Sequence, residues 1–250
     1  MAARNSDEHQ GPRRHQEMDS TRWSVVLAAG DADSEIARTA FESLCELYWY
    51  PIYAFVRRRV PSADEAQDLT QDFFARVLEK NYFADANPDR GRFRAFLLTA
   101  VKHFLANHWQ KEKALKRGGG RTAYSFDFKE GESRYGLEPA TNKTAEVLFD
   151  EEWAVTLVNH VLDLLRKEFE VADKANTFAV LKQHLAGRIA EVSCAEAAES
   201  LNMTAGAVRV AVHRMRKRYK ELLRAEIAQT VATPSEIDDE IRRLFSSLGS

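Results

Sequence analysis

Apolar residues recur at helical spacing along two long parts of the chain, residues 23–115 and 145–228. This spacing is typical of amphipathic helices, whereas no segment shows the alternation of apolar and polar residues that indicates a strand. The two parts are separated by three consecutive glycines, Gly118 to Gly120, and by a stretch that mixes Gly, Pro, Ser and charged residues without a period. Such a stretch favours a flexible linker. The sequence therefore predicts an all-α protein with two helical domains joined by a linker.

The domain limits follow from these changes in composition. We expect the two helical domains at residues 21–116 and 145–230, the linker at 117–144 and a helical extension at 231–250. Residues 1–20 are polar and poor in large apolar side chains, which predicts disorder. They also lack the apolar run of a signal peptide, and no stretch is apolar over the length that crosses a membrane. We therefore expect a soluble, cytoplasmic protein.

Enzyme chemistry finds little support in the residue pattern. Cys45 and Cys194 each lie inside a helical pattern, so we expect two buried, reduced thiols, with a catalytic or metal-binding role as the alternative. No nucleophile stands beside a base, no glycine loop has the context of a phosphate site, and no His-containing set has metal-ligand spacing. We therefore predict a protein that is not an enzyme and uses no cofactor or metal. The net charge of −2 does not indicate nucleic acid, so any such signal must come from local clusters.

Residues 193–219 have the spacing of a helix-turn-helix. The run from Ser193 to Glu196 is a capping box that predicts the start of a short helix. Asn202 tolerates the left-handed backbone of a sharp turn, and Thr204 is a suitable cap for a second, longer helix. The side chains that recur every three or four positions on this second helix should pack inward: Val208, Val212, Met215 and Tyr219.

The outer face of this second helix is rich in cations and poor in acids. Crowded like charges are mildly unfavourable within a helix, so an anionic partner is indicated, and DNA phosphate in the major groove is the partner that we expect. The alternative is a solvated basic helix. The first turn, Ala205 to Ala207, cannot hydrogen-bond to base edges, so Arg209 and His213 are the better candidates for base contacts. The predicted DNA-binding residues of this helix are Thr204, Arg209, His213, Arg214, Arg216, Lys217 and Lys220.

The front half carries an acidic edge, which we define as Asp64, Asp68 and Asp72. A capping box from Ser62 to Glu65 opens the helix that holds them, and their spacing of four places all three on one side. The acidic edge gains no stabilising interaction within its own helix, which suggests a basic docking partner. A solvated face is an equal alternative. A metal or hydrolase site is not indicated, because a row on one helix does not form a pocket.

Residues 93–113 form a third strong helical pattern, in which aromatic side chains alternate with cations. This mixture suits single-stranded nucleic acid, whose bases stack and whose phosphates pair with cations. At helical spacing most of these aromatic side chains should belong to the core. Trp109, late in the helix among polar residues, is the one that we expect to be partly exposed.

Together, the two halves resemble a sigma factor of the extracytoplasmic-function (ECF) subfamily. Residues 66–74, AQDLTQDFF, are similar to the acidic-apolar motif that docks on the β′ clamp helices of core RNA polymerase. Residues 94–111 resemble the segment that binds the melted downstream promoter element, and residues 193–223 resemble the helix-turn-helix that reads the upstream element. The resemblance covers about 37–115 and 146–224, in the order found in the family.

This resemblance implies a sigma-2-like front domain, a sigma-4-like rear domain, and a function in promoter recognition, melting and transcription initiation. The implied partners are core polymerase, through its β′ clamp helices and β flap, promoter DNA, and an anti-sigma factor or a Ser/Thr kinase. The docking residues would be Asp64, Asp68, Gln71, Asp72 and Phe74. The downstream element would meet Asn81, Arg90, Arg92, Lys102, His103, Trp109 and Lys111, with the loop at 81–92 capturing an extruded base. The alternative function is a helix-turn-helix regulator that binds DNA without polymerase.

Three features depart from the family pattern. His103, Asn107 and Gln110 stand where the family often has Asn, Asp and Arg. Gln67 replaces a common second acid in the docking motif, and Thr70 lies within that motif. We hypothesise that phosphorylation of Thr70 restores negative charge to the docking edge, as in a kinase-linked branch of the family. The alternative is that Thr70 is simply a half-buried helix residue.

The C-terminal extension is additional to the compact family pattern. Thr233 to Glu236 form a capping box with Pro234 at the first helical position. The helix that follows would either pack on the rear bundle or serve as a regulatory or partner-docking helix. Its apolar stripe is Ile237, Ile241, Leu244, Phe245 and Leu248.

Overall fold

The computed structural model confirms an all-α fold: among the residues that it describes, no strand occurs. None of the helices in this part of the chain combines the length and apolarity that a membrane crossing requires. The described residues are 35–79, 92–114, 126–137, 143–185, 191–231 and 233–249.

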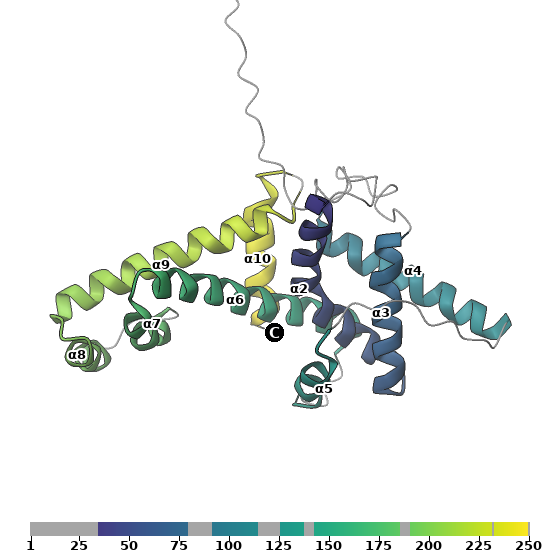
Figure 1. The fold of residues 1–250 in the computed structure, drawn as a ribbon, viewed down its shortest axis with the longest axis horizontal. Coiled ribbons are helices and arrows are strands. Elements are labelled where there is room, and N and C mark those ends of the chain that lie inside the picture. The colour runs from purple at the N-terminus through teal and green to yellow at the C-terminus, as the bar shows by residue number, and fades with distance from the viewer. Residues whose placement is uncertain are drawn as a thin grey trace, which may run out of the picture.

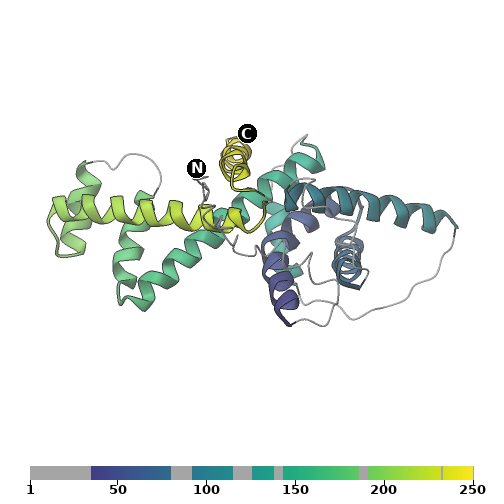
Figure 2. The same cartoon turned by 90° about the horizontal axis from the view of Figure 1, so that it is seen from above.

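Two long helices, α6 and α9, pack on each other between the left-hand end and the middle of the molecule in Figure 1, and Figure 2 shows that they cross at an angle. At one end α6 packs against α2, beside α3, α4 and α5, and at the other end α7 and α8 join α6 and α9. The C-terminal α10 crosses between the two ends and packs on both long helices. The front helices are α2 (Glu35–Arg57), α3 (Ala63–Glu79), α4 (Phe93–Ala114) and α5 (Phe128–Leu137). The others are α6 (Ala145–Val171), α7 (Ala175–Leu181), the 3₁₀ turn η2 (Lys182–His184), α8 (Glu191–Ser200), α9 (Ala205–Ala228) and α10 (Glu236–Leu248).

Buried apolar side chains form two cores of unequal size. The large core joins α2, α3 and α4 to the first half of α6, the end of α9, and α10. Phe149 of α6, for example, is fully buried with its ring edge-on to Phe55 of α2. The small core lies at the other end, where Leu165 and Phe178 meet Val212 and Met215 of α9. Thus α6 and α9 each contribute to both cores, and the large core contains residues from both halves of the sequence.

Part of the stretch expected to be a linker is helical: α5 covers Phe128–Leu137, and residues 126 and 127 lead into it. Phe126 stacks on Trp49 of α2 and approaches Phe74 of α3, and Phe128 packs edge-on against the same Trp49. Composition did not predict this helix because it has no apolar period; two aromatic side chains and their partners on α2 hold it in place instead.

Local signals in the sequence set most of the helix starts. The Glu65 amide donates to Ser62 Oγ at 3.1 Å, as the capping box predicts. The Thr233 amide donates to the Glu236 carboxylate at 3.0 Å, but α10 begins at Glu236 with Ser235 at its cap, so Pro234 precedes the helix instead of opening it. Another expectation was wrong. Helix α8 begins at Glu191, so Ser193 lies within the helix rather than at its cap.

Candidate nucleic-acid interface

A short turn joins α8 to α9. Asn202 adopts a left-handed backbone with φ of 50°, and the Met203 amide donates to the Ala198 carbonyl at 2.8 Å. Thr204 has an extended backbone, and its hydroxyl accepts from the Ala207 amide at 3.2 Å, which starts α9. The chain therefore reverses over a few residues and presents α9 beside α8, as the spacing of the segment predicts.

The inner face of α9 fixes its rotation. Val208, Val212 and Met215 are buried against Ala197 and Ala198 of α8 and their neighbours in the small core. The two alanines have no side chain beyond Cβ, so the helices approach closely. Tyr219, one turn further, is half-buried, and its hydroxyl donates to the Val158 carbonyl of α6 at 3.3 Å. This burial leaves the opposite side of α9 in solvent.

That solvent side is the α9 cationic face, which consists of Arg209, His213, Arg214, Lys217 and Lys220. All five side chains are exposed. Within the described part of the chain, Arg209, Arg214 and Lys220 form no ion pair or hydrogen bond, and Lys217, 73% exposed, only approaches Glu221 at 4.0 Å. Thr204 is also exposed at the start of the helix. The cations Arg209, Arg214, Lys217 and Lys220 are therefore available to an external anion.

Arg216, in contrast, is directed into the protein. Its Nε and Nη2 donate to the backbone carbonyl of His184 at 2.8 and 2.6 Å. This fork ties α9 to the end of η2, so the guanidinium serves the fold rather than the outer surface. The prediction that Arg216 contacts DNA rested on helical position alone, which does not show where a long side chain bends.

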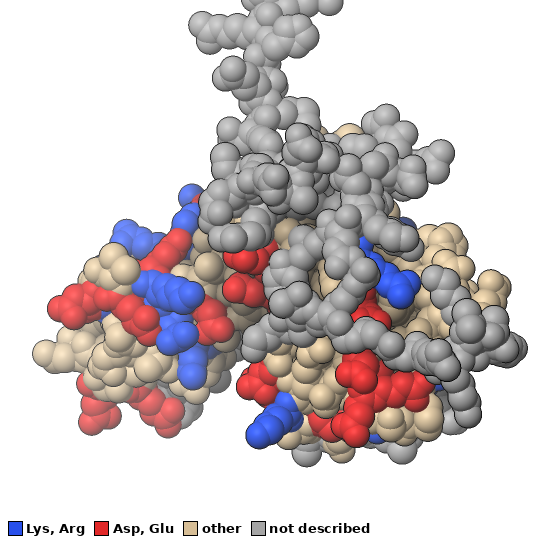
Figure 3. Space-filling view, turned by 45° about the vertical axis from the view of Figure 1, so that its right-hand side comes forward, with Lys and Arg blue, Asp and Glu red and all other residues tan. Residues whose placement is uncertain are grey.

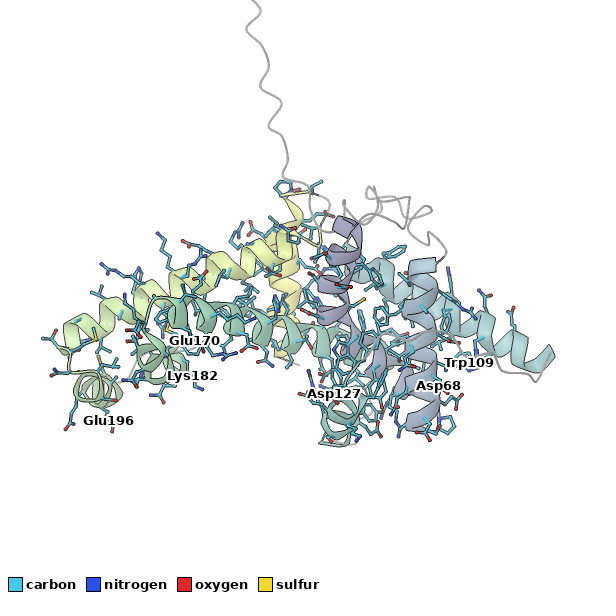
Figure 4. All side chains as sticks on the ribbon, in the orientation of Figure 1. Asp68, Trp109, Asp127, Glu170, Lys182 and Glu196 are labelled. Carbon is cyan, nitrogen blue, oxygen red and sulfur yellow. The ribbon has the colours of Figure 1, made fainter. Side chains whose placement is uncertain are left out.

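The acidic edge lies on α3. Asp64 and Asp68 are exposed, while Gln71 and Asp72 are half-buried. No ion pair between described residues involves these three aspartates. Figure 3 shows acidic side chains gathered on the lower side of this half of the molecule, where α3 begins. Asp68 lies at the opposite end of the molecule from Glu196 of α8 (Figure 4).

Two residues of the docking motif are inside the protein. Phe74 is 1% exposed and packs against Phe41, Phe73 and Phe126, so it belongs to the large core and not to a docking surface. Thr70 is 0% exposed, and its hydroxyl donates to the Ala66 carbonyl at 2.7 Å. A phosphoryl group cannot be added to this hydroxyl in the conformation described here.

The cations near α4 are occupied by carboxylates from later in the chain. Arg92 lies within reach of Asp239 and Glu240 of α10. Lys102 is 2.9 Å from Glu146 at the start of α6. This contact, first by its hydrogen bond and then by charge, lowers the pKa of Glu146. Sequence patterns did not predict these acids as site residues, because the pairs join segments that are distant in the chain.

The remaining predicted downstream residues have mixed outcomes. His103 is exposed on α4, and Trp109 is half-buried against the large core, as expected for that residue (Figure 4). Asn81, Arg90 and the side chain of Lys111 lie outside the described residues.

Comparison with known proteins gives one match. Residues 46–115 match the family model of sigma-70 region 2. No curated protein and no solved structure gave a match. The matched segment contains the second half of α2 and all of α3 and α4, and so includes the acidic edge and the cations of α4. The match covers less than half of the chain, and it makes this segment similar to region 2 of sigma-70 factors.

Proposed function

We propose that this chain is an ECF-type sigma factor that binds core RNA polymerase through α3 and directs initiation at promoters through α9 and α4. The observation that carries the proposal is the combination of a sigma-70 region 2 at residues 46–115 with a capped helix-turn-helix whose cationic face is exposed and unneutralised. A helix of this kind fits the major groove, and its cations release counterions from DNA on binding.

Two parts of α9 would make different contacts in the upstream promoter element. Arg209 and His213 lie nearest the start of the helix among the exposed cations, so they would reach base edges. Lys217 and Lys220 lie further along the helix and would bind phosphates, which position the protein without reading sequence. Thr204 and Arg214 flank these groups.

The acidic edge would bind a basic surface of the polymerase clamp. Asp64 and Asp68 are exposed and pair with no described cation, so docking would not require an internal ion pair to break. Opposite charges on the two surfaces would mainly increase the association rate and the specificity of docking.

Run-off transcription with core polymerase on a genomic promoter library tests the function directly. Start sites that appear only when this protein is added are the expected result. The variant with Arg209→Ala and Arg214→Ala should lose these start sites, whereas Arg166→Ala, an exposed α6 arginine paired within its own helix, should retain them. Duplex DNA binding without copurification of core polymerase would instead identify a regulator that acts alone.

A variant with Asp64→Asn and Asp68→Asn tests the docking surface separately. Copurification with core polymerase should fall, while binding of the isolated protein to duplex DNA should not change. Glu130→Gln on α5, also an exposed acid, is the matched control. Equal copurification of both variants would remove the acidic edge from the proposal.

A further inference from the structure

Acidic side chains of the C-terminal helix α10 contact two arginines at the start of α4 and form a cluster of largely buried charges. Arg94 Nε donates to Glu240 Oε1 at 2.9 Å, and Arg92 Nε lies 2.9 Å from Glu240 Oε2. Asp239 lies 3.6 Å from Arg92 Nη2. The Glu240 side chain is 1% exposed and the Arg94 side chain 7%, so solvent is nearly excluded. One carboxylate of α10 therefore lies between two guanidinium groups at the α4 start, hydrogen-bonded to Arg94 and in charge contact with Arg92.

Packing holds this carboxylate in place. Leu244 of α10 is fully buried in the large core, and Ile237 and Ile241 pack against the same core. The Phe93 amide donates to the Thr230 carbonyl at 3.0 Å, which joins the first residue of α4 to the segment that leads into α10. The C-terminal helix is thus a packed part of the described structure.

Arg94 is paired with two acids from later in the sequence, Glu240 and Asp150. Asp150 lies on α6, and the Arg94 guanidinium lies 4.7 Å from the centre of the Trp153 ring. Burial alone would lower the pKa of Arg94, but the hydrogen bond and charge of Glu240, with the charge of Asp150, raise it overall. The cation is therefore retained at every physiological pH and requires an anion beside it.

The chemistry of the guanidinium group makes these contacts exclusive. Arg94 gives its Nε to Glu240 and its Nη1 to Asp150, and a guanidinium donor that is held by a carboxylate oxygen is not available to a phosphate oxygen. A buried ion pair is often no more stable than apolar residues of the same volume, but removal of one partner alone leaves a costly buried charge. Release of Glu240 thus becomes favourable where a second anion replaces it.

We propose that α10 is an internal acidic competitor for DNA: Asp239 and Glu240 occupy Arg92 and Arg94, and α10 must leave α4 before these arginines bind strand phosphates. This inference rests on the proposed function in that it takes α4 as the surface for the downstream promoter strand. Lys102, further along α4, is held by Glu146 of α6 and not by α10, so it lies outside this competition. The free protein therefore binds single-stranded DNA weakly until α10 is displaced.

A charge-removing variant with a neighbouring control tests the competitor. Glu240→Gln keeps the side-chain volume but removes the charge that holds both arginines. Asp238→Asn is the matched control, because Asp238 lies on the same helix and pairs with Arg224 of α9, away from α4.

Affinity is measured by fluorescence anisotropy with short, mixed-sequence single-stranded DNA. We expect Glu240→Gln to bind about tenfold more tightly than the wild type, a shift of about 1.4 kcal/mol, and Asp238→Asn to bind as the wild type does. Equal affinity of the two folded variants would overturn the proposal.

Hydrogen exchange in the wild-type chain provides a second test that needs no variant and applies even where Glu240→Gln does not fold. Saturating single-stranded DNA should increase the exchange of amides in 237–248, because α10 leaves its site. Unchanged protection of α10, together with new protection of α4, would show that DNA binds without displacement and would overturn the proposal. The run-off assay remains separate: transcription by the wild type, with equal DNA affinities of the two variants, rejects only the competitor.

Discussion

Arg218 of α9 forms a two-pronged hydrogen-bonded ion pair with Glu168 of α6, at 2.9 and 2.6 Å. It also donates to Glu221 at 3.2 Å on its own helix. The hydrogen bond from Arg218, together with its charge, lowers the pKa of Glu168. Arg218 thus differs from its neighbours Arg214 and Lys217: it fastens the two long helices together, whereas they face solvent. Cations in one basic run therefore serve two different purposes.

Substitution of single cations on α9 should separate these purposes. Arg214→Ala should weaken binding to duplex promoter DNA and decrease the salt dependence of that binding by about one counterion, with no change in stability. Arg218→Ala should leave the salt dependence unchanged and lower the free energy of unfolding by about 1 kcal/mol or less, as is usual for an exposed ion pair. DNA titrations at several salt concentrations and denaturant unfolding measure both quantities. A similar loss of DNA affinity in the two variants would contradict this division.

Phe74→Ala should act on folding rather than on polymerase docking. The ring is enclosed by three other aromatic side chains, so its removal leaves a cavity and should lower the free energy of unfolding by about 3–5 kcal/mol. Asp68→Asn, on the exposed side of α3, should leave stability within about 0.5 kcal/mol. Urea unfolding of both variants measures this contrast. A stable Phe74→Ala protein with impaired docking would show that Phe74 contributes to the docking surface.

The sequence predicted elements whose signals are local. Thr204 and Asn202 determine the turn between α8 and α9 by the preferences of their own backbones, and the acidic edge follows from the spacing of Asp64 and Asp68. It did not predict contacts that depend on distant segments. Glu240 meets Arg94 across 146 residues, and nothing near either residue indicates the other. Phe74 was assigned to the surface because a motif gives residue types but does not show which side of a helix is buried.

Thr70 provides a test of whether the docking motif is modified. Because its hydroxyl is buried and bonded to the Ala66 carbonyl, Thr70→Ala should lower the free energy of unfolding by about 1 kcal/mol. Thr70→Asp places an unpaired carboxylate in the core and should cost several kcal/mol more than Thr70→Ala. Thermal unfolding of the two variants gives the comparison.

The phosphorylation hypothesis makes a further, opposite prediction for the same variants. If added charge at Thr70 activates docking, Thr70→Asp should bind core polymerase more tightly than Thr70→Ala does, despite its lower stability. Equal or weaker binding by Thr70→Asp would count against phosphorylation as a switch at this position.

Acid should loosen the contact between α4 and α6. The pKa of Glu146 lies below its ordinary value of 4.5, first because Lys102 donates a hydrogen bond to it, and also because of the charges of Arg59 and Lys102. A carboxylate with a lowered pKa in the folded state binds fewer protons there than in the unfolded state, so its stabilising effect is fully present above pH 4.5. The effect is lost as the pH falls through the lower, folded-state pKa.

Glu146→Gln should therefore be less stable than the wild type at neutral pH, and the difference should diminish below pH 4.5. Denaturant unfolding at a series of pH values measures it, with Glu196→Gln, an exposed acid on α8, as the control. A difference that persists unchanged into acid would show that Glu146 acts through packing rather than through its charge.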